Sequence, residues 1–144
     1  MEIGVNGLTC SQCTRSVEIQ IRKLGFVKDV DMNLEHTDGK VVFKEQKKVD
    51  VNKIAQAVKD AGFSVRSLEA QFLFNHVNVS QGYCFDYQGD KYQFVQVPQK
   101  ELNGPVTLKF VGENFLPKKE YKKWEPNLKN NCSNNTGKTY YVTM

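Results

Sequence analysis

The first 68 residues alternate between two spacings of apolar residues, and this alternation limits the folds that the chain can adopt. An apolar residue at every second position predicts strands at residues 2–6, 27–34, 40–44 and 63–68. Apolar residues spaced three and four positions apart predict helices at residues 11–24 and 51–61. The expected order is therefore strand, helix, strand, strand, helix, strand.

Cap and turn residues mark the boundaries of these elements. Asp50 precedes the second helical segment as an N-cap, and Gly25 and Gly62 stand where a helix C-terminus favours a left-handed residue. The Asp38-Gly39 dipeptide predicts the turn of a hairpin between the second and third strands. The order predicts a ferredoxin-like split β-α-β sandwich, with both helices on one face of an antiparallel sheet.

The pattern changes near residues 69–71, where aromatic-rich alternating segments begin. They predict strands at residues 72–79, 83–87, 91–97, 106–111 and 139–143, with turns at Gln88-Gly89-Asp90 and Asn103-Gly104-Pro105. A helix is expected at residues 117–124 and a loop at residues 127–138. The chain is thus an α+β protein with two expected domains, a ferredoxin-like one at 1–70 and a small, mostly β one at 71–144. The second resembles an OB-like barrel in its expected strand pattern.

The charge distribution argues against a nucleic-acid partner. The net charge is +4, and residues 71–144 contain Lys but no Arg, the residue that best fits phosphates and bases. The one concentrated basic group, Lys118, Lys119, Lys122 and Lys123, is expected to be a solvated face. No apolar run approaches the roughly eighteen residues of a membrane helix. The sequence as it stands predicts a cytoplasmic protein, or a periplasmic or exported one if a signal peptide has been removed.

Cys10 and Cys13 are separated by two residues at the start of the first predicted helix, in the segment Gly7-Leu8-Thr9-Cys10-Ser11-Gln12-Cys13. This spacing can direct both sulfur atoms to one point. The unpaired N–H groups and the dipole at a helix N-terminus favour the thiolate form of cysteine, which is both ligand and nucleophile.

Such a pair has three interpretations: half of a zinc site, a redox pair, or a two-thiolate site for a soft ion. A zinc site needs two further ligands, and the first half offers only His36, near the expected hairpin turn. Thioredoxin-like enzymes carry aromatic or Pro residues beside the pair. Here the neighbours of the two cysteines are Thr9, Ser11, Gln12 and Thr14. An open two-sulfur site for a soft, low-coordinate ion fits best.

The segment also resembles a known family, the heavy-metal-associated domain of copper chaperones, metal-transporting P-type ATPases and mercury-binding proteins. The resemblance covers residues 2–68 and rests on three motifs in order, Gly7-Leu8-Thr9-Cys10-Ser11-Gln12-Cys13, Val17-Glu18 and Ala61-Gly62-Phe63. It implies that Cys10 and Cys13 bind the metal, that Phe63 packs beneath the loop, and that Leu8, in place of the usual Met, anchors it. Thr9 precedes the first Cys, and in this position the segment is similar to the copper(I) members of the family. Cu(I) is therefore the expected ion, with Hg(II), Zn(II) and Cd(II) as alternatives.

The remaining candidate residues have structural interpretations. His36 is expected to be a solvated hairpin residue and His76 to pack within a strand. Cys84 and Cys132 are either buried free thiols or, in an exported protein, a disulfide. Seven aromatic residues at strand spacing are expected to form a core rather than a platform for stacking bases: Phe72, Phe74, Tyr83, Phe85, Tyr87, Tyr92 and Phe94.

The leading hypothesis is a non-enzymatic protein that binds one Cu(I) between Cys10 and Cys13 and transfers it to an acceptor protein, or sequesters it. A metal-bridged dimer is a further expectation. The second hypothesis is a thiol–disulfide oxidoreductase that uses the same pair. In the third, the C-terminal half docks a protein while the N-terminal half senses metal.

Overall fold

The computed structural model describes residues 1–132 and 138–144, and it divides into two compact units, Met1–Leu68 and Glu69–Met144. Residues 1–68 are unit 1 and residues 69–144 are unit 2. Of the loop expected at residues 127–138, residues 133–137 lie outside the described residues. In the described part of the chain, no helix combines the length and the apolar character needed to span a bilayer.

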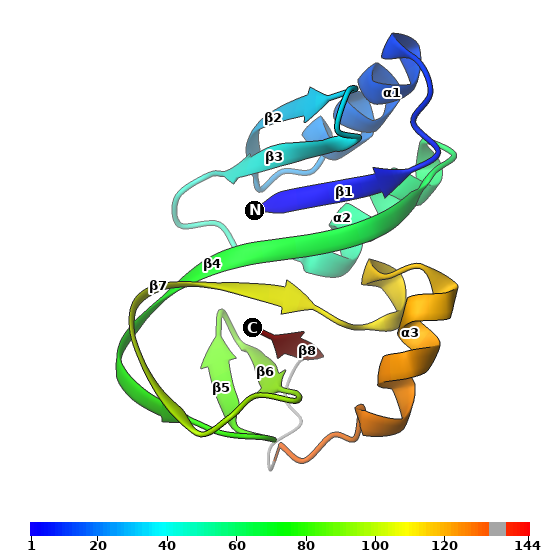
Figure 1. The fold of residues 1–144 in the computed structure, drawn as a ribbon. Helices are drawn as coiled ribbons and strands as arrows, with labels where there is room; N and C mark the ends of the chain where they lie inside the picture. The colour runs from blue at the N-terminus through cyan, green and yellow to red at the C-terminus, as the bar shows by residue number, and fades with distance from the viewer. Residues whose placement is uncertain (133–137) are drawn as a thin grey trace. The chain divides into compact units, whose positions relative to one another are not determined.

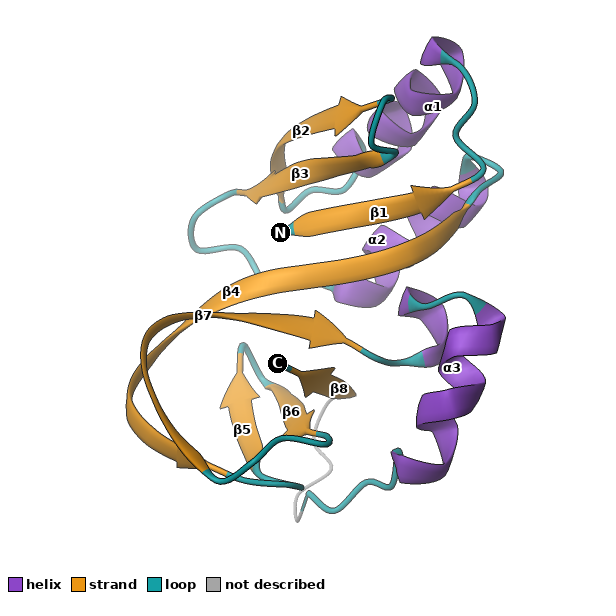
Figure 2. Cartoon of the chain, in the orientation of Figure 1, coloured by secondary structure: helices purple, strands orange, loops and turns teal. Residues whose placement is uncertain are grey.

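Unit 1 has the order of elements that the hydrophobic spacing predicts (Figure 1). They are β1 (Glu2–Asn6), α1 (Ser11–Arg22), β2 (Val27–Asn33), β3 (Asp38–Phe43), α2 (Val51–Asp60) and the first part of β4 (Ser64–Val79). The strands lie in the order β2-β3-β1-β4, and β3 pairs antiparallel with both β1 and β2. Figure 2 shows α1 and α2 on the same side of these strands. Unit 1 therefore has the ferredoxin-like arrangement.

The core of unit 1 lies between this sheet and the two helices. Val17 and Ile21 of α1 and Ile54 and Val58 of α2 are all 0% exposed. The strands contribute further buried residues, namely Ile3, Val5, Val30, Val41, Val65 and Leu68. Each such side chain contributes about 1.5–3 kcal/mol when it leaves water. The two helical stripes that the sequence shows are thus the surfaces that hold unit 1 together.

The two helix ends differ from each other. Gly62 follows α2 with a φ of +92°, as predicted. The prediction for Gly25 was wrong, because α1 ends at Arg22 and Gly25 is not among the glycines with positive φ. Leu24 N donates to Ile21 O at 3.1 Å and Val27 N donates to Leu24 O at 3.0 Å, so two successive turns lead the chain from α1 into β2 without a left-handed residue.

The hairpin turn predicted at Asp38-Gly39 was also wrong. These two residues begin β3, where they pair with Asn33 and Met32, and the turn lies between β2 and β3 at residues 34–37. Thr37 takes the positive φ of 53°, and Asn33 Oδ1 accepts a hydrogen bond from His36 N at 3.2 Å. A Cβ at Gly39 would lie 2.7 Å from the Asp31 carbonyl oxygen. Glycine is therefore required there for close strand packing, and not for a turn.

Unit 2 is a sheet with one helix and two 3-10 turns. Its elements are the second part of β4, β5 (Cys84–Tyr87), β6 (Asp90–Phe94), β7 (Lys100–Phe110), η1 (Glu113–Phe115), α3 (Lys118–Trp124), η2 (Glu125–Asn127) and β8 (Thr139–Thr143). The strand order is β4-β7-β8-β6-β5, and β6 pairs parallel with β8. The turn predicted before Asp90 is present, with positive φ at Gln88 and Gly89. The OB-like description of this unit stays a prediction.

Three predictions for this part of the chain were wrong. The strands expected at 63–68 and 72–79 are one strand, β4, in which Glu69 and Ala70 are half-buried and Gln71 is exposed. Asn103-Gly104-Pro105 lies inside β7, where Gly104 has a φ of +82° opposite a bulge in β4. His76 is in that bulge with a φ of 49°, so its side chain is 67% exposed and Nδ1 lies 2.6 Å from Glu101 Oε1. It does not pack within the strand.

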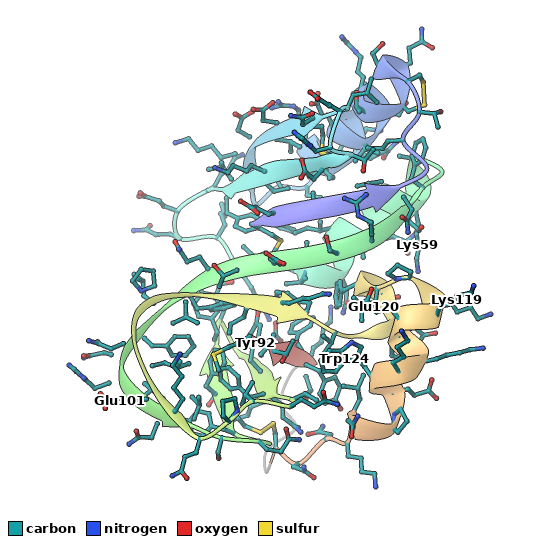
Figure 3. All side chains as sticks on the ribbon, viewed as in Figure 1. Lys59, Tyr92, Glu101, Lys119, Glu120 and Trp124 are labelled. Atoms are coloured by element: carbon teal, nitrogen blue, oxygen red, sulfur yellow. A yellow bond between two sulfur atoms is a disulfide. The ribbon has the colours of Figure 1, made fainter. Side chains whose placement is uncertain are left out.

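Aromatic side chains form the core of unit 2. Phe74, Tyr92 and Phe94 are buried, and the ring of Tyr92 lies 5.2 Å from those of Phe85 and Tyr140. Figure 3 shows Tyr92 among the strands of this unit and Glu101 at its margin. Tyr87, which was expected in the core, is 46% exposed. Most of these aromatic residues therefore pack in the core, and the exposed one, Tyr87, lies on β5.

Candidate metal-binding site

Cys10 and Cys13 both belong to the first turn of α1. Cys10 is the N-cap, with extended backbone angles, and its Sγ accepts a hydrogen bond from Cys13 N at 3.2 Å. The Cys10 carbonyl oxygen also accepts hydrogen bonds from Cys13 N at 3.1 Å and Thr14 N at 3.3 Å. Sulfur here occupies the place of the Ser or Asp oxygen that normally caps a helix. Cys10 therefore caps the N-terminus of α1, and Cys13 is the third residue of the helix.

The two sulfur atoms are joined in a disulfide, and the Cα atoms are 5.2 Å apart. Cys10 is exposed and Cys13 is half-buried. Both sulfurs therefore face solvent from one point at the helix end. Reduction by two electrons and two protons would give two thiols at that point.

The loop that presents the pair rests on apolar groups. Leu8 is 6% exposed, so its side chain anchors the loop in the core of unit 1. Gly7 has a φ of +91°, and a Cβ there would lie 3.2 Å from Cδ1 of Phe63. The Phe63 ring thus lies against the Gly7 backbone. Thr9, by contrast, is exposed beside Cys10.

The electrostatic setting of the pair is that of a helix N-terminus without acidic residues. The first turn of α1 contains no Asp or Glu. The polar residues behind the pair are Ser11, Gln12, Thr14, Arg15 and Glu18, which line a shallow depression. The positive end of the helix dipole stabilises negative charge within this turn by about 0.3–1 kcal/mol. The setting favours thiolates over thiols.

The second motif of the family pattern, Val17-Glu18, also has a defined position. Val17 is fully buried, and the Glu18 side chain accepts a hydrogen bond from Met32 N at 3.0 Å through Oε1. Glu18 thereby ties α1 to β2, which is an edge strand. Its contribution is to hold the helix in place rather than to bind an ion.

Two thiolates at this position can bind a soft ion or exchange with another disulfide. Within residues 1–132 and 138–144, no group of three or more His, Cys, Asp or Glu side chains could hold a metal ion. His36 is exposed in the turn before β3. The donors that the structure brings together are therefore the two sulfurs.

The other cysteine pair belongs to unit 2. Cys84 and Cys132 form a disulfide with Cα atoms 5.8 Å apart. Cys132 is buried beside Gln93, whose side chain also accepts from Asn131 N at 3.0 Å and donates to Lys129 O at 2.8 Å. The disulfide and Gln93 fix the segment that precedes residue 133. This pair has a structural role in the unit.

One functional feature at the site was not predicted from the sequence, namely the hydrogen bond by which Cys10 Sγ caps α1. The position of Cys10 immediately before the helical pattern was the available signal. Cysteine is an uncommon N-cap, and the spacing of Cys10 to Cys13 indicates a zinc site, a redox pair or a two-thiolate site rather than a cap.

Comparison with known proteins places these residues in a wider group. A family model for the heavy-metal-associated domain matches residues 2–64. The chain is 38% identical over 63 residues to the copper chaperone CopZ of Bacillus subtilis, which covers 44% of this chain and 90% of CopZ.

Two relatives of other kinds match similar lengths. A copper-transporting ATPase of Rhizobium meliloti is 41% identical over 69 residues, which is 48% of this chain but only 8% of the ATPase. The periplasmic component of a mercuric transport system of Pseudomonas fluorescens is 36% identical over 61 residues, 42% of this chain and 66% of that protein. The family match ends at residue 64, so it describes unit 1.

Proposed function

This chain belongs to the heavy-metal-associated domain family, and from that membership we propose that it binds one soft metal ion between the sulfurs of Cys10 and Cys13 and transfers it to a partner protein. The observation that carries the proposal is the position of both sulfur atoms at one exposed point of a helix N-terminus. Soft thiolates favour soft ions of low coordination number. Cu(I) is the proposed cargo.

The choice of Cu(I) has two supports. The relatives with copper in their names include a chaperone that unit 1 matches over nearly its whole length. Thr9 precedes Cys10, as in the copper members that the sequence resembles. Hg(II) is the next candidate, because a relative of similar identity is a mercuric transport protein. Zn(II) and Cd(II) follow, since both favour more than two ligands.

Transfer follows from the exposure of the pair. An incoming thiolate of a partner can approach on the solvent side of Cys10, because Thr9, Cys10 and Ser11 are all exposed. The partner's sulfur joins the two existing ones, and one cysteine of this chain then leaves. The exchange changes no oxidation state, since the metal–sulfur bond that forms to the partner is matched by the one that breaks to this chain. The same approach by a second copy of this chain would give a metal-bridged dimer.

The test is a titration of the reduced full chain with Cu(I) under a competing chelator, without oxygen. We expect one tightly bound Cu(I) per chain. The double substitution Cys10→Ser/Cys13→Ser should abolish that binding, because the hydroxyl is a hard, neutral donor. The matched control is Cys84→Ser/Cys132→Ser, which removes the same number of sulfurs and should leave the stoichiometry unchanged. Equal Cu(I) binding by the wild type and the Cys10/Cys13 variant would refute the proposal.

A second function is favoured by one observation, the exposed disulfide between Cys10 and Cys13. A thiol–disulfide oxidoreductase would use the same two sulfurs to reduce or oxidise a substrate disulfide. An insulin-reduction assay with dithiothreitol separates the two functions. The carrier proposal expects no turnover above the rate with dithiothreitol alone, whereas an oxidoreductase accelerates the reaction.

The Cys84–Cys132 disulfide supports a periplasmic or exported location over a cytoplasmic one, because such bonds persist in oxidising compartments. In the alternative hypothesis, unit 2 docks a protein while unit 1 senses metal.

A further inference from the structure

A groove of about 410 Å³ lies in unit 2, and all of its lining residues come from this unit. Its floor is aromatic. The ring of Phe72 on β4 lies 5.8 Å from that of Phe85 and 5.3 Å from that of Tyr87, both on β5. Leu73 and Asp86, the neighbours of these rings, form the walls. The groove therefore runs between β4 and β5, which contact each other through side chains.

β5 forms one wall of the groove, and some of its backbone N–H and C=O groups point outward from the edge of the sheet. β5 is the last strand in the order β4-β7-β8-β6-β5. Phe94 N donates to Tyr83 O, which makes that pair hydrogen-bonded. In the register of this hairpin, Asp86 then pairs with Lys91 in a position that is not hydrogen-bonded. The N–H and C=O of Asp86 therefore face away from β6.

The wall formed by β4 has the same property. Leu73 pairs with Pro105 on β7, and Pro105 has no N–H to donate. This pair must be one of the positions that exchange no hydrogen bonds, so the N–H and C=O of Leu73 face away from β7. Leu73 is also 83% exposed, more than any other large apolar residue in the described part of the chain. Two strand edges with outward backbone groups thus face one groove.

We propose that this groove binds an extended polypeptide segment of a partner protein, which enters between β4 and β5 as an added strand. The outward N–H and C=O groups of β4 and β5 can form hydrogen bonds with the N–H and C=O groups on both sides of an extended polypeptide. A small apolar molecule has no such groups. Strand addition of this kind derives affinity from main-chain hydrogen bonds and specificity from alternate side chains. Here, alternate apolar side chains would lie on Phe72, Phe85 and Tyr87.

The length of the groove sets the length of the segment. β5 contains four residues, which span about 13 Å at the rise of a strand. A segment of about four residues therefore fills it. Exposed edges next to an apolar residue such as Leu73 are the surfaces at which sheets pair with other chains. A partner strand at this place would make unit 2 the docking part of the protein.

The experiment is an NMR titration of the oxidised full chain, labelled with ¹⁵N, with the peptide acetyl-Lys-Thr-Val-Thr-Val-Thr-Lys-amide. We expect the amide signals of Leu73, Cys84 and Asp86 to shift and their hydrogen exchange to slow. Two control peptides carry N-methyl groups either on both Val residues or on the Thr residues, so that each blocks one edge of the strand. Both should bind about tenfold more weakly, because each loses hydrogen bonds to one wall.

Equal binding of all three peptides, or weakening by one control alone, would overturn insertion between two edges. Asp86→Pro removes the outward N–H of β5 and should weaken the peptide about tenfold, whereas Asp86→Asn keeps it and should not. If Asp86→Pro does not fold, the N-methyl peptides still decide. Self-association of the chain that blocks the peptide in sedimentation experiments would assign the groove to a second copy and overturn the partner-protein proposal.

Discussion

Gly7 lies at the point where the loop of the candidate site turns over Phe63. Its φ of +91° is in the left-handed region, and a Cβ would meet the Phe63 ring at 3.2 Å. Gly7→Ala should therefore lower the free energy of unfolding by about 1–2 kcal/mol, through backbone strain together with a steric contact. Urea unfolding of unit 1, followed by circular dichroism, measures this loss.

Two other glycines separate the strain from the contact. Gly62 has a φ of +92° but nothing within 4 Å of its added Cβ, so Gly62→Ala should show the strain alone. Gly25 has open space and no positive φ, so Gly25→Ala should change the free energy of unfolding by less than about 0.5 kcal/mol. If Gly7→Ala were no more harmful than Gly62→Ala, the contact with Phe63 would not support the loop as described.

At the scale of elements, local signals predicted the helices better than the strands. Val17 and Ile21, and likewise Ile54 and Val58, are four residues apart, and that spacing alone defines a buried helical face. The candidate site was predictable for the same reason, since Cys10 and Cys13 are close in sequence and in one helical turn. The groove between β4 and β5 was not, because it depends on the pairing of strands distant in sequence.

The wrong turn predictions have a common cause. Asp38-Gly39 and Asn103-Gly104 are turn dipeptides, yet both lie within strands. In each case, a neighbouring strand decides the role of the glycine: Gly39 allows β2 to approach, and Gly104 opposes a bulge in β4. A single sequence does not contain these long-range contacts in readable form.

Tyr92 of β6 gives unit 2 a dependence on alkaline pH. Burial, and then the nearby Tyr140, Asp90 and Tyr87, raise the pKa of its phenol well above the ordinary value of 10.0. Above that ordinary value the unfolded chain releases this proton while the folded chain keeps it, so stability falls as pH rises. The loss should be about 1 kcal/mol between pH 9.5 and 11. Tyr92→Phe should lack this part of the pH dependence in urea unfolding. Parallel curves for the two proteins would contradict the assignment.

At the scale of the whole molecule, the two disulfides should differ in their effect on stability. Cys84 and Cys132 are separated by 48 positions and Cys10 and Cys13 by 3. The longer loop loses more entropy in the unfolded chain, so Cys84→Ser/Cys132→Ser should lower the free energy of unfolding by about 4 kcal/mol. Trp124, the single Trp of the chain, lies in unit 2 and reports this transition by fluorescence.

The Cys10→Ser/Cys13→Ser variant is the control for that measurement. It removes a disulfide from unit 1, where the short loop predicts a loss of about 2 kcal/mol at most. The Trp124 transition should move clearly less than in the Cys84/Cys132 variant. Equal shifts in the two variants would show that loop length does not govern the stability of this chain.

The cap formed by Cys10 has a practical consequence for genetics. Serine is one of the best residues for starting a helix, so an allele with serine at this position deletes the sulfur and keeps the backbone anchor. An alanine allele would remove both at once and mix a metal phenotype with a folding defect. A metal-blind strain built on serine would therefore keep the helix start that an alanine strain loses.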